Sequence, residues 1–188
     1  MPRFSPASAL TSAFAGEAAR RLPLTESEFL AMYARTAGPL CGYLRRLTGS
    51  ASLAEDLLQD AYIRFLSVGR PPSGDEHQKN YLYRIATNLA RDHFRATKRR
   101  TPVEIGDLSS GAPPADRRDV WTQLERLSAR DRELLLLAYV EGMTHQEIAA
   151  VTGLMRASVR PLLFRARKRF GRLLSAAGLA PASIGERA

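Results

Sequence analysis

Basic and aromatic side chains alternate along the segment Lys79–Arg100 in a pattern suited to binding nucleic acid. Polar and positively charged residues recur there at spacings of four and three, at Arg84, Asn88, Arg91, Arg95 and Lys98. Such spacing places their side chains on one face of a helix. Positive charge attracts the phosphate backbone and flat rings stack on unpaired bases, so this face with Tyr81, Tyr83 and Phe94 suits single-stranded or melted nucleic acid. The alternative is that the rings belong to the core and the charges only solubilise the surface.

A second basic segment has the pattern of a helix-turn-helix. Thr144 and Glu147 have the spacing of a capping box, and Gly153 allows a turn between two short helices. The second helix carries an apolar stripe at spacings of four and three: Val159, Leu163, Ala166, Phe170 and Leu173. Its other faces hold seven basic residues and no acid: Arg156, Arg160, Arg165, Arg167, Lys168, Arg169 and Arg172. We therefore expect a helix that packs on one side and meets phosphate on the other.

The positive charge of the chain is concentrated in these two segments. The formal net charge is +9 over 188 residues, yet Lys79–Arg100 holds seven basic residues against one acid and Arg156–Arg172 holds seven against none. The rest of the chain is therefore net negative. This distribution favours a polyanionic partner that is contacted at two places over a uniformly basic surface.

Several other classes of function have little support in the residues. Cys41 is the single cysteine and the three histidines lie far apart, so the sequence predicts no disulfide, metal site or other cofactor. No nucleophile–base set or glycine-rich phosphate loop is present, which argues against an enzyme. No apolar run is long enough to span a membrane, and no export signal is recognisable, so we expect a cytoplasmic protein without membrane insertion.

The remaining pattern is helical throughout and predicts an all-α protein with two small helical domains. We expect an N-terminal extension at 1–24, a first domain at 25–100, a flexible linker at 101–116, a second domain at 117–174 and a tail at 175–188. In the first domain, a capping box at Thr25 opens a helix that Gly38–Pro39 interrupts, and a second box at Ser52 opens a helix to about Val68. A polar loop at 69–78 then precedes a helix over about 79–97. In the second domain, Ser128 is expected to cap a helix.

The helix expected after Ser52 has an acidic and polar face that stands out on a basic protein. This face consists of Glu55, Asp56, Gln59 and Asp60. Acids near a helix N-terminus are stabilised by the helix dipole, so the face could simply be solvated.

Three segments together resemble the extracytoplasmic-function (ECF) sigma factors of bacterial RNA polymerase, which belong to group 4 of the sigma-70 family. Ala54–Leu66 (AEDLLQDAYIRFL) is similar to the helix of sigma region 2.2, and Asn80–Arg95 (NYLYRIATNLARDHFR) is similar to regions 2.3 and 2.4. Leu127–Arg169 is similar to region 4. The three occur in the order of the family, with a linker where the family has one. The resemblance covers residues 26–100 and 117–174.

The resemblance implies an alternative sigma factor that binds core RNA polymerase, recognises −35 and −10 promoter elements and assists promoter melting, without catalytic activity of its own. It implies contact with the β′ clamp helices through Asp56, Leu57, Gln59 and Asp60, and with the −10 element through Tyr81, Arg84, Asn88, Arg91, Arg95 and Lys98. It implies −35 contacts through Arg156, Ser158, Arg160, Arg165, Arg167 and Lys168. The expected partners are core polymerase (also through its β flap), promoter DNA and an anti-sigma factor.

Two residues depart from the family pattern. Tyr81 stands where the family usually has tryptophan, and Pro161 stands inside the expected recognition helix. A proline in a second helical turn lacks an amide donor and crowds the carbonyl four residues before it. We therefore expect a shifted or kinked start, with Ser158 as the N-cap and Pro161 in the tolerated first turn. The departure weakens the assignment of base contacts to Arg156 and Arg160.

The main rival is a stand-alone helix-turn-helix regulator whose residues 26–100 form an effector-binding helical domain. The segment Lys79–Arg100 discriminates between the two, because an effector domain has no reason to carry a basic face with interleaved rings.

Overall fold

The computed structural model describes residues 24–69, 71–100 and 115–179, and within these ranges all regular secondary structure is helical. The elements are α2 (Glu26–Thr48), α3 (Ala51–Leu66), α4 (Asp75–Arg100), α5 (Ala115–Glu125), α6 (Ala129–Tyr139), α7 (His145–Thr152) and α8 (Arg156–Ala176). The all-α expectation is confirmed. Nearly all of the expected extension, most of the expected linker and the end of the expected tail lie outside the described residues.

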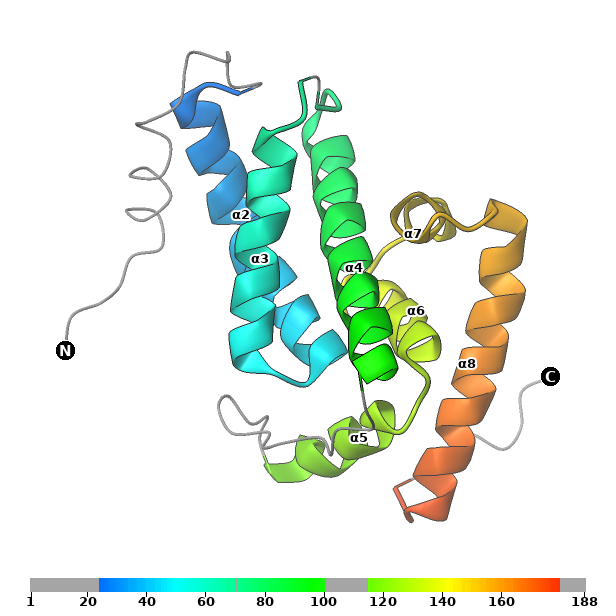
Figure 1. Ribbon diagram of the computed structural model, residues 1–188. Coiled ribbons are helices and arrows are strands. Elements are labelled where there is room, and N and C mark those ends of the chain that lie inside the picture. Colours follow the sequence, from blue (N-terminus) through cyan, green and yellow to red (C-terminus); the bar gives the residue numbers. More distant parts are fainter. Residues whose placement is uncertain (1–23, 70, 101–114, 180–188) are drawn as a thin grey trace.

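Helices α2, α3 and α4 pack side by side and form the N-terminal unit (Figure 1). The capping box at Thr25 is confirmed: its hydroxyl accepts from the Glu28 amide, and Glu28 accepts from the Thr25 amide at 2.7 Å. The expected interruption at Gly38–Pro39 is wrong, because α2 runs through Pro39. Buried side chains on both sides of the proline, Thr36 and Leu40, show that tertiary packing outweighs local propensity here.

The next two helices both begin earlier than the sequence pattern indicates. Ser50, not Ser52, caps α3, and its hydroxyl accepts from the Leu53 amide at 3.3 Å. α4 begins at Asp75, so the polar loop is shorter than expected. The carboxylate of Asp75 lies at the positive end of the helix and receives a hydrogen bond from Arg35 Nη1 at 2.7 Å. This ion pair ties the start of α4 to α2.

Helices α5 to α8 form the C-terminal unit (Figure 1). Ser128 caps α6 as expected, accepting from the Asp131 amide at 3.1 Å. The capping box of Thr144 with Glu147 opens α7, and Gly153 closes it with a φ of 72°, a left-handed conformation that glycine adopts without strain. These contacts confirm the helix-turn-helix pattern of α7 and α8.

The expectation that α8 starts at Ser158 is wrong. α8 begins at Arg156, and the Ser158 amide already donates to the Met155 carbonyl at 2.8 Å. Pro161 is therefore the sixth helical residue, beyond the first turn. Burial of Val159 and Leu163 stabilises the helix on the core side. Ala157 is exposed, so water can reach the carbonyl that Pro161 leaves without a helical donor.

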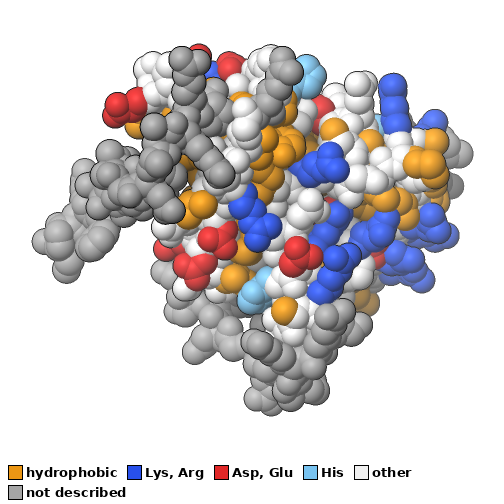
Figure 2. Space-filling view, turned by 45° about the horizontal axis from the view of Figure 1, so that its top comes forward, with side chains coloured by type: hydrophobic (Ala, Val, Ile, Leu, Met, Phe, Trp, Pro, Cys, Tyr) orange, Lys and Arg blue, Asp and Glu red, His pale blue; other side chains and the backbone are white. Residues whose placement is uncertain are grey.

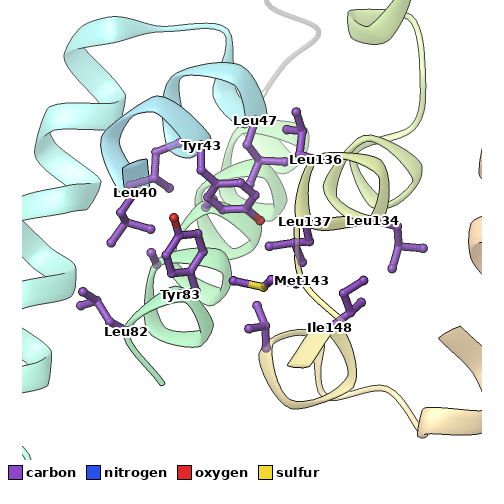
Figure 3. Close-up of a cluster of buried hydrophobic side chains, with 14 of the residues drawn as sticks. Leu40, Tyr43, Leu47, Leu82, Tyr83, Leu134, Leu136, Leu137, Met143 and Ile148 are labelled. Atoms are coloured by element: carbon purple, nitrogen blue, oxygen red, sulfur yellow. The ribbon is translucent and has the colours of Figure 1, made fainter. Parts of the chain in front are cut away.

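The two units share one continuous hydrophobic core, which the sequence did not predict. Figure 3 shows Tyr43 and Leu47 of the N-terminal unit facing Leu136 of the C-terminal unit, with Tyr83 beside Met143. α4 packs on α7, and α2 packs on α6. Arg46 adds a cation–π contact, 5.5 Å from the ring centroid of Trp121. The described residues therefore form one body in which the units are closed on each other.

Candidate nucleic-acid interface

The basic face of α4, defined as Arg84, Asn88, Arg91, Arg95 and Lys98, is positioned by the buried stripe on the opposite side of the helix. Leu82, Ala86 and Leu89 are 0%, 0% and 6% exposed, so they fix the rotation of α4. Arg84, Asn88 and Arg95 are consequently exposed to solvent. Lys98 lies in the last turn of the same helix.

The three rings of α4 have different environments. Tyr83 is fully buried, and its hydroxyl donates to Glu141 Oε2 of the C-terminal unit at 2.5 Å. Burial, followed by this bond to a carboxylate, raises the pKa of Tyr83. Tyr81 and Phe94 are half-buried, and the Tyr81 ring lies 6.1 Å from that of Phe65. The core interpretation is therefore confirmed for Tyr83, and only the other two rings have surface for stacking.

Arg91 forms an ion pair with the other unit, unlike the two exposed arginines of the basic face, Arg84 and Arg95. Its Nη2 donates to Glu133 Oε1 at 2.6 Å, its Nε donates to Glu133 Oε2 at 3.0 Å, and its Nη1 donates to the Thr152 carbonyl at 3.1 Å. The Glu133 side chain is 3% exposed and that of Arg91 is 29% exposed. Burial raises the pKa of Glu133, and the bonds from Arg91 oppose that rise. This bidentate pair spans the two units.

The acidic face of α3 is exposed to solvent and consists of Glu55, Asp56, Gln59 and Asp60. It lies opposite the buried residues Ala54, Ala61 and Tyr62 of the same helix. Leu57, by contrast, is only 6% exposed and belongs to the core. The structure thus separates Leu57 from the three polar residues with which the resemblance grouped it.

α8 presents its positive charge away from the core. Val159, Leu163 and Ala166 are buried as the stripe predicts, and five of the expected DNA-contacting residues are exposed: Arg156, Arg160, Arg165, Arg167 and Lys168. Ser158, the sixth, is half-buried. Among the basic residues of α8, Arg169 alone has an ion pair with a described acid, donating to both carboxylate oxygens of Asp131 at 2.8 and 2.9 Å.

Figure 2 shows the Lys and Arg side chains gathered toward the side of the molecule where α8 lies, with acidic side chains toward the α3 side. This separation of charge gives one face suited to phosphate and another suited to a basic protein surface. Across the described ranges, no cluster of three or more potential metal ligands occurs. None of the helices at 24–69, 71–100 and 115–179 is both long and apolar enough to cross a membrane.

The residues that close the units on each other were missed by sequence reasoning. Glu133 and Glu141 bond to α4 as described, Asn80 Nδ2 donates to Glu147 Oε1 at 3.5 Å, and Arg132 Nη1 donates to the Leu47 carbonyl at 3.0 Å. The one available signal was Glu133, a charged residue directly beside the apolar run Leu134–Leu137. A glutamate beside such an apolar run tends to be buried with it, and a buried carboxylate is rarely found without a partner of opposite charge.

Comparison with known proteins adds independent findings. The family model of sigma-70 region 2 matches residues 32–100, and that of sigma-70 region 4 matches residues 117–170. The chain is 32% identical over 154 residues to the probable ECF RNA polymerase sigma factor SigI of Mycobacterium tuberculosis, covering 73% of this chain but 52% of SigI. It is 30% identical over 158 residues to the RNA polymerase sigma factor CarQ of Myxococcus xanthus, covering 79% of this chain and 90% of CarQ.

A solved structure has a similar fold. CnrH, in complex with the cytosolic domain of CnrY, superposes with a TM-score of 0.63 at 25% identity, covering 81% of this chain and 90% of CnrH. The match to SigI spans only about half the length of that relative.

Proposed function

Because the chain belongs to the extracytoplasmic-function group of the sigma-70 family, we propose that it binds core RNA polymerase, recognises −35 and −10 promoter elements and assists melting. It does so in the cytoplasm and without a catalytic reaction of its own. The observation that carries this proposal is the pair of exposed basic faces, on α4 and α8, in separate units of one chain. A stand-alone regulator needs only the second of them.

The basic face of α4 contacts the −10 element. Arg84, Asn88 and Arg95 are exposed along one side of a helix and suit the backbone of a melted strand. Tyr81, half-buried against Phe65, can offer part of its ring to an unstacked base while the rest stays in the core. This division of roles lets the strand be held by charge and stabilised by stacking.

α8 contacts the −35 element in the major groove, as the second helix of a helix-turn-helix does. Arg156 and Arg160 lie in its first and second turns, where base edges are in reach, while Arg165, Arg167 and Lys168 suit the phosphates. The start of α8 at Arg156 makes base contact by these two arginines compatible with Pro161.

The acidic face of α3 binds the polymerase. Asp56, Gln59 and Asp60 are exposed, and no ion pair between described residues involves either aspartate. We assign these residues to the β′ clamp helices, and the C-terminal unit to the β flap. An anti-sigma protein is a further partner, which is in keeping with the protein complex in which CnrH was solved.

Polymerase binding tests the proposal against the stand-alone regulator. The tagged chain should retain core polymerase, and the double variant Asp56→Asn, Asp60→Asn should lose at least about tenfold in affinity, since each interfacial charge pair contributes about 1.5 kcal/mol or more. Glu26→Gln, an exposed acid on α2, is the matched control and should bind normally. A chain that never retains polymerase would support the regulator instead.

A further inference from the structure

We propose that the C-terminal unit is an intramolecular competitor of the −10 strand, held closed by the ion pair of Arg91 with Glu133. This inference rests on the proposed function of α4 and adds a regulatory contact to it. In the closed body, one side chain cannot serve both partners: every nitrogen of the Arg91 guanidinium donates to Glu133, Thr152 or Asn88. A phosphate of the promoter strand would need the same donors.

Glu133 has the geometry of a phosphate substitute. It accepts two roughly parallel bonds from Arg91, at 2.6 and 3.0 Å, which is the bidentate arrangement that arginine also forms with phosphate. Because Arg91 stands in the middle of the basic face of α4, Glu133 neutralises positive charge where the promoter strand would lie. The nearly complete burial of Glu133 also keeps water from competing for the pair.

Two further contacts place the C-terminal unit along the same helix. Tyr83 donates to Glu141, and Asn80 donates to Glu147, so carboxylates of the C-terminal unit bond to α4 at three levels along its length. Figure 3 shows apolar side chains of both units meeting in one core, including Leu47, Leu136 and Met143. The closed state therefore combines a shared apolar core with carboxylates of the C-terminal unit that bond to side chains of α4.

The dimensions of a promoter require this arrangement to open. The −10 and −35 elements lie about 25 base pairs apart, or about 85 Å at 3.4 Å per base pair. A closed body of this size has a radius of gyration of only about 15 Å. Fourteen residues stand between Arg100 and Ala115, and fourteen residues span at most about 50 Å. Together with the dimensions of the two units, this chain length is enough to reach both elements. Occupation of both elements and the closed body are thus mutually exclusive.

The test compares two buried acids of α6 whose arginine partners lie in different units. Glu133 pairs with Arg91 across the units, whereas Asp131 pairs with Arg169 inside the C-terminal unit. Both are almost fully buried, and Glu133→Gln and Asp131→Asn each remove one negative charge. Binding of the full chain to a fluorescein-labelled single-stranded DNA of mixed sequence is measured by fluorescence anisotropy, at one fixed salt concentration because affinity depends on salt.

We expect Glu133→Gln to bind this probe about tenfold more tightly than the natural chain, since 1.4 kcal/mol of lost competition corresponds to that factor. Asp131→Asn should stay within about twofold. Equal affinities for all three chains, or an equal gain in affinity in both variants, would overturn the proposal that the Arg91–Glu133 pair competes with the DNA strand. If none of the three chains binds the single-stranded DNA, both the proposed competition and the −10 contact of α4 fail. Retention of core polymerase then tests the rest of the proposed function separately.

A second measurement covers the case in which Glu133→Gln does not fold. Small-angle neutron scattering of the natural chain, with and without saturating probe and with the DNA matched out by the D2O content of the solvent, gives the radius of gyration of the protein alone. We expect the radius to rise on DNA binding because the units separate. Bound DNA with no change in the protein's radius would overturn the proposal.

Discussion

Replacing Pro161 by alanine should stabilise the protein, and the sign of the effect depends on where α8 begins. With the helix starting at Arg156, Pro161 is the sixth residue and deprives the Ala157 carbonyl of its donor. A helix-interior proline is less favourable than alanine by about 3 kcal/mol. Because both residues are exposed and water can reach that carbonyl, we expect about 2 kcal/mol to be recovered. For a chain of this size, Tm should rise by about 6 °C.

The assay is urea unfolding followed by circular dichroism, with Lys168→Ala as an exposed control on the same helix. The control should change the free energy of unfolding by less than about 0.5 kcal/mol. If α8 instead began at Ser158, Pro161 would lie in the first turn and would restrict the unfolded chain at no cost to the helix. Pro161→Ala would then lower stability by about 0.4–1 kcal/mol. A loss of that size would refute the helix start described above.

Three further perturbations test how the fold is held together. Thr144→Ala removes the capping box with Glu147 and should lower the free energy of unfolding in urea by about 1 kcal/mol. Hydrogen bonds from Thr144 lower the pKa of Glu147 in the folded state. The contribution of Glu147 to stability should therefore be present above its unfolded pKa and lost as pH falls through the lower folded value. Leu163 is 4% exposed, so Leu163→Ala should lower the free energy of unfolding by about 2–5 kcal/mol, whereas Phe164→Ala, at a residue 57% exposed, should lower it far less. Equal losses would contradict the burial of the apolar stripe of α8. Burial raises the pKa of the three fully buried tyrosines, Tyr43, Tyr62 and Tyr83, that of Tyr62 to about 12. The folded state therefore holds protons that the unfolded state releases above pH 10, so stability should fall as pH rises from 10, by up to about 1.4 kcal/mol per pH unit for each tyrosine. A flat urea midpoint between pH 9 and 11 would contradict their burial.

Local patterns predicted the helices well because their causes are local. The capping boxes at Thr25 and Thr144, the cap at Ser128 and the turn at Gly153 each depend on residues within three positions of each other. The apolar stripe of α8 likewise follows from helical periodicity alone. Where two serines compete for one cap, as Ser50 and Ser52 do, spacing alone chose the wrong one.

Features that depend on distant residues could not be predicted. Pro39 and Pro161 both lie inside helices, since buried neighbours supplied by other elements outweigh a local preference for breaking. The pairing of Arg91 with Glu133 joins residues 42 positions apart, and nothing in either segment specifies the other. The sequence therefore predicted which residues carry charge on α4, but not that one of them is held by the other unit.

Run-off transcription measures directly whether the chain directs core RNA polymerase to promoters. Core RNA polymerase is combined with the purified chain on a pool of fragments from the source genome, and transcripts are mapped at their starts. We expect defined transcripts that appear only when the chain is present, and that weaken when Arg84 and Arg95, both exposed on α4, are replaced by alanine. The absence of any transcript that depends on the chain would contradict its assignment as a promoter-recognising subunit of the polymerase.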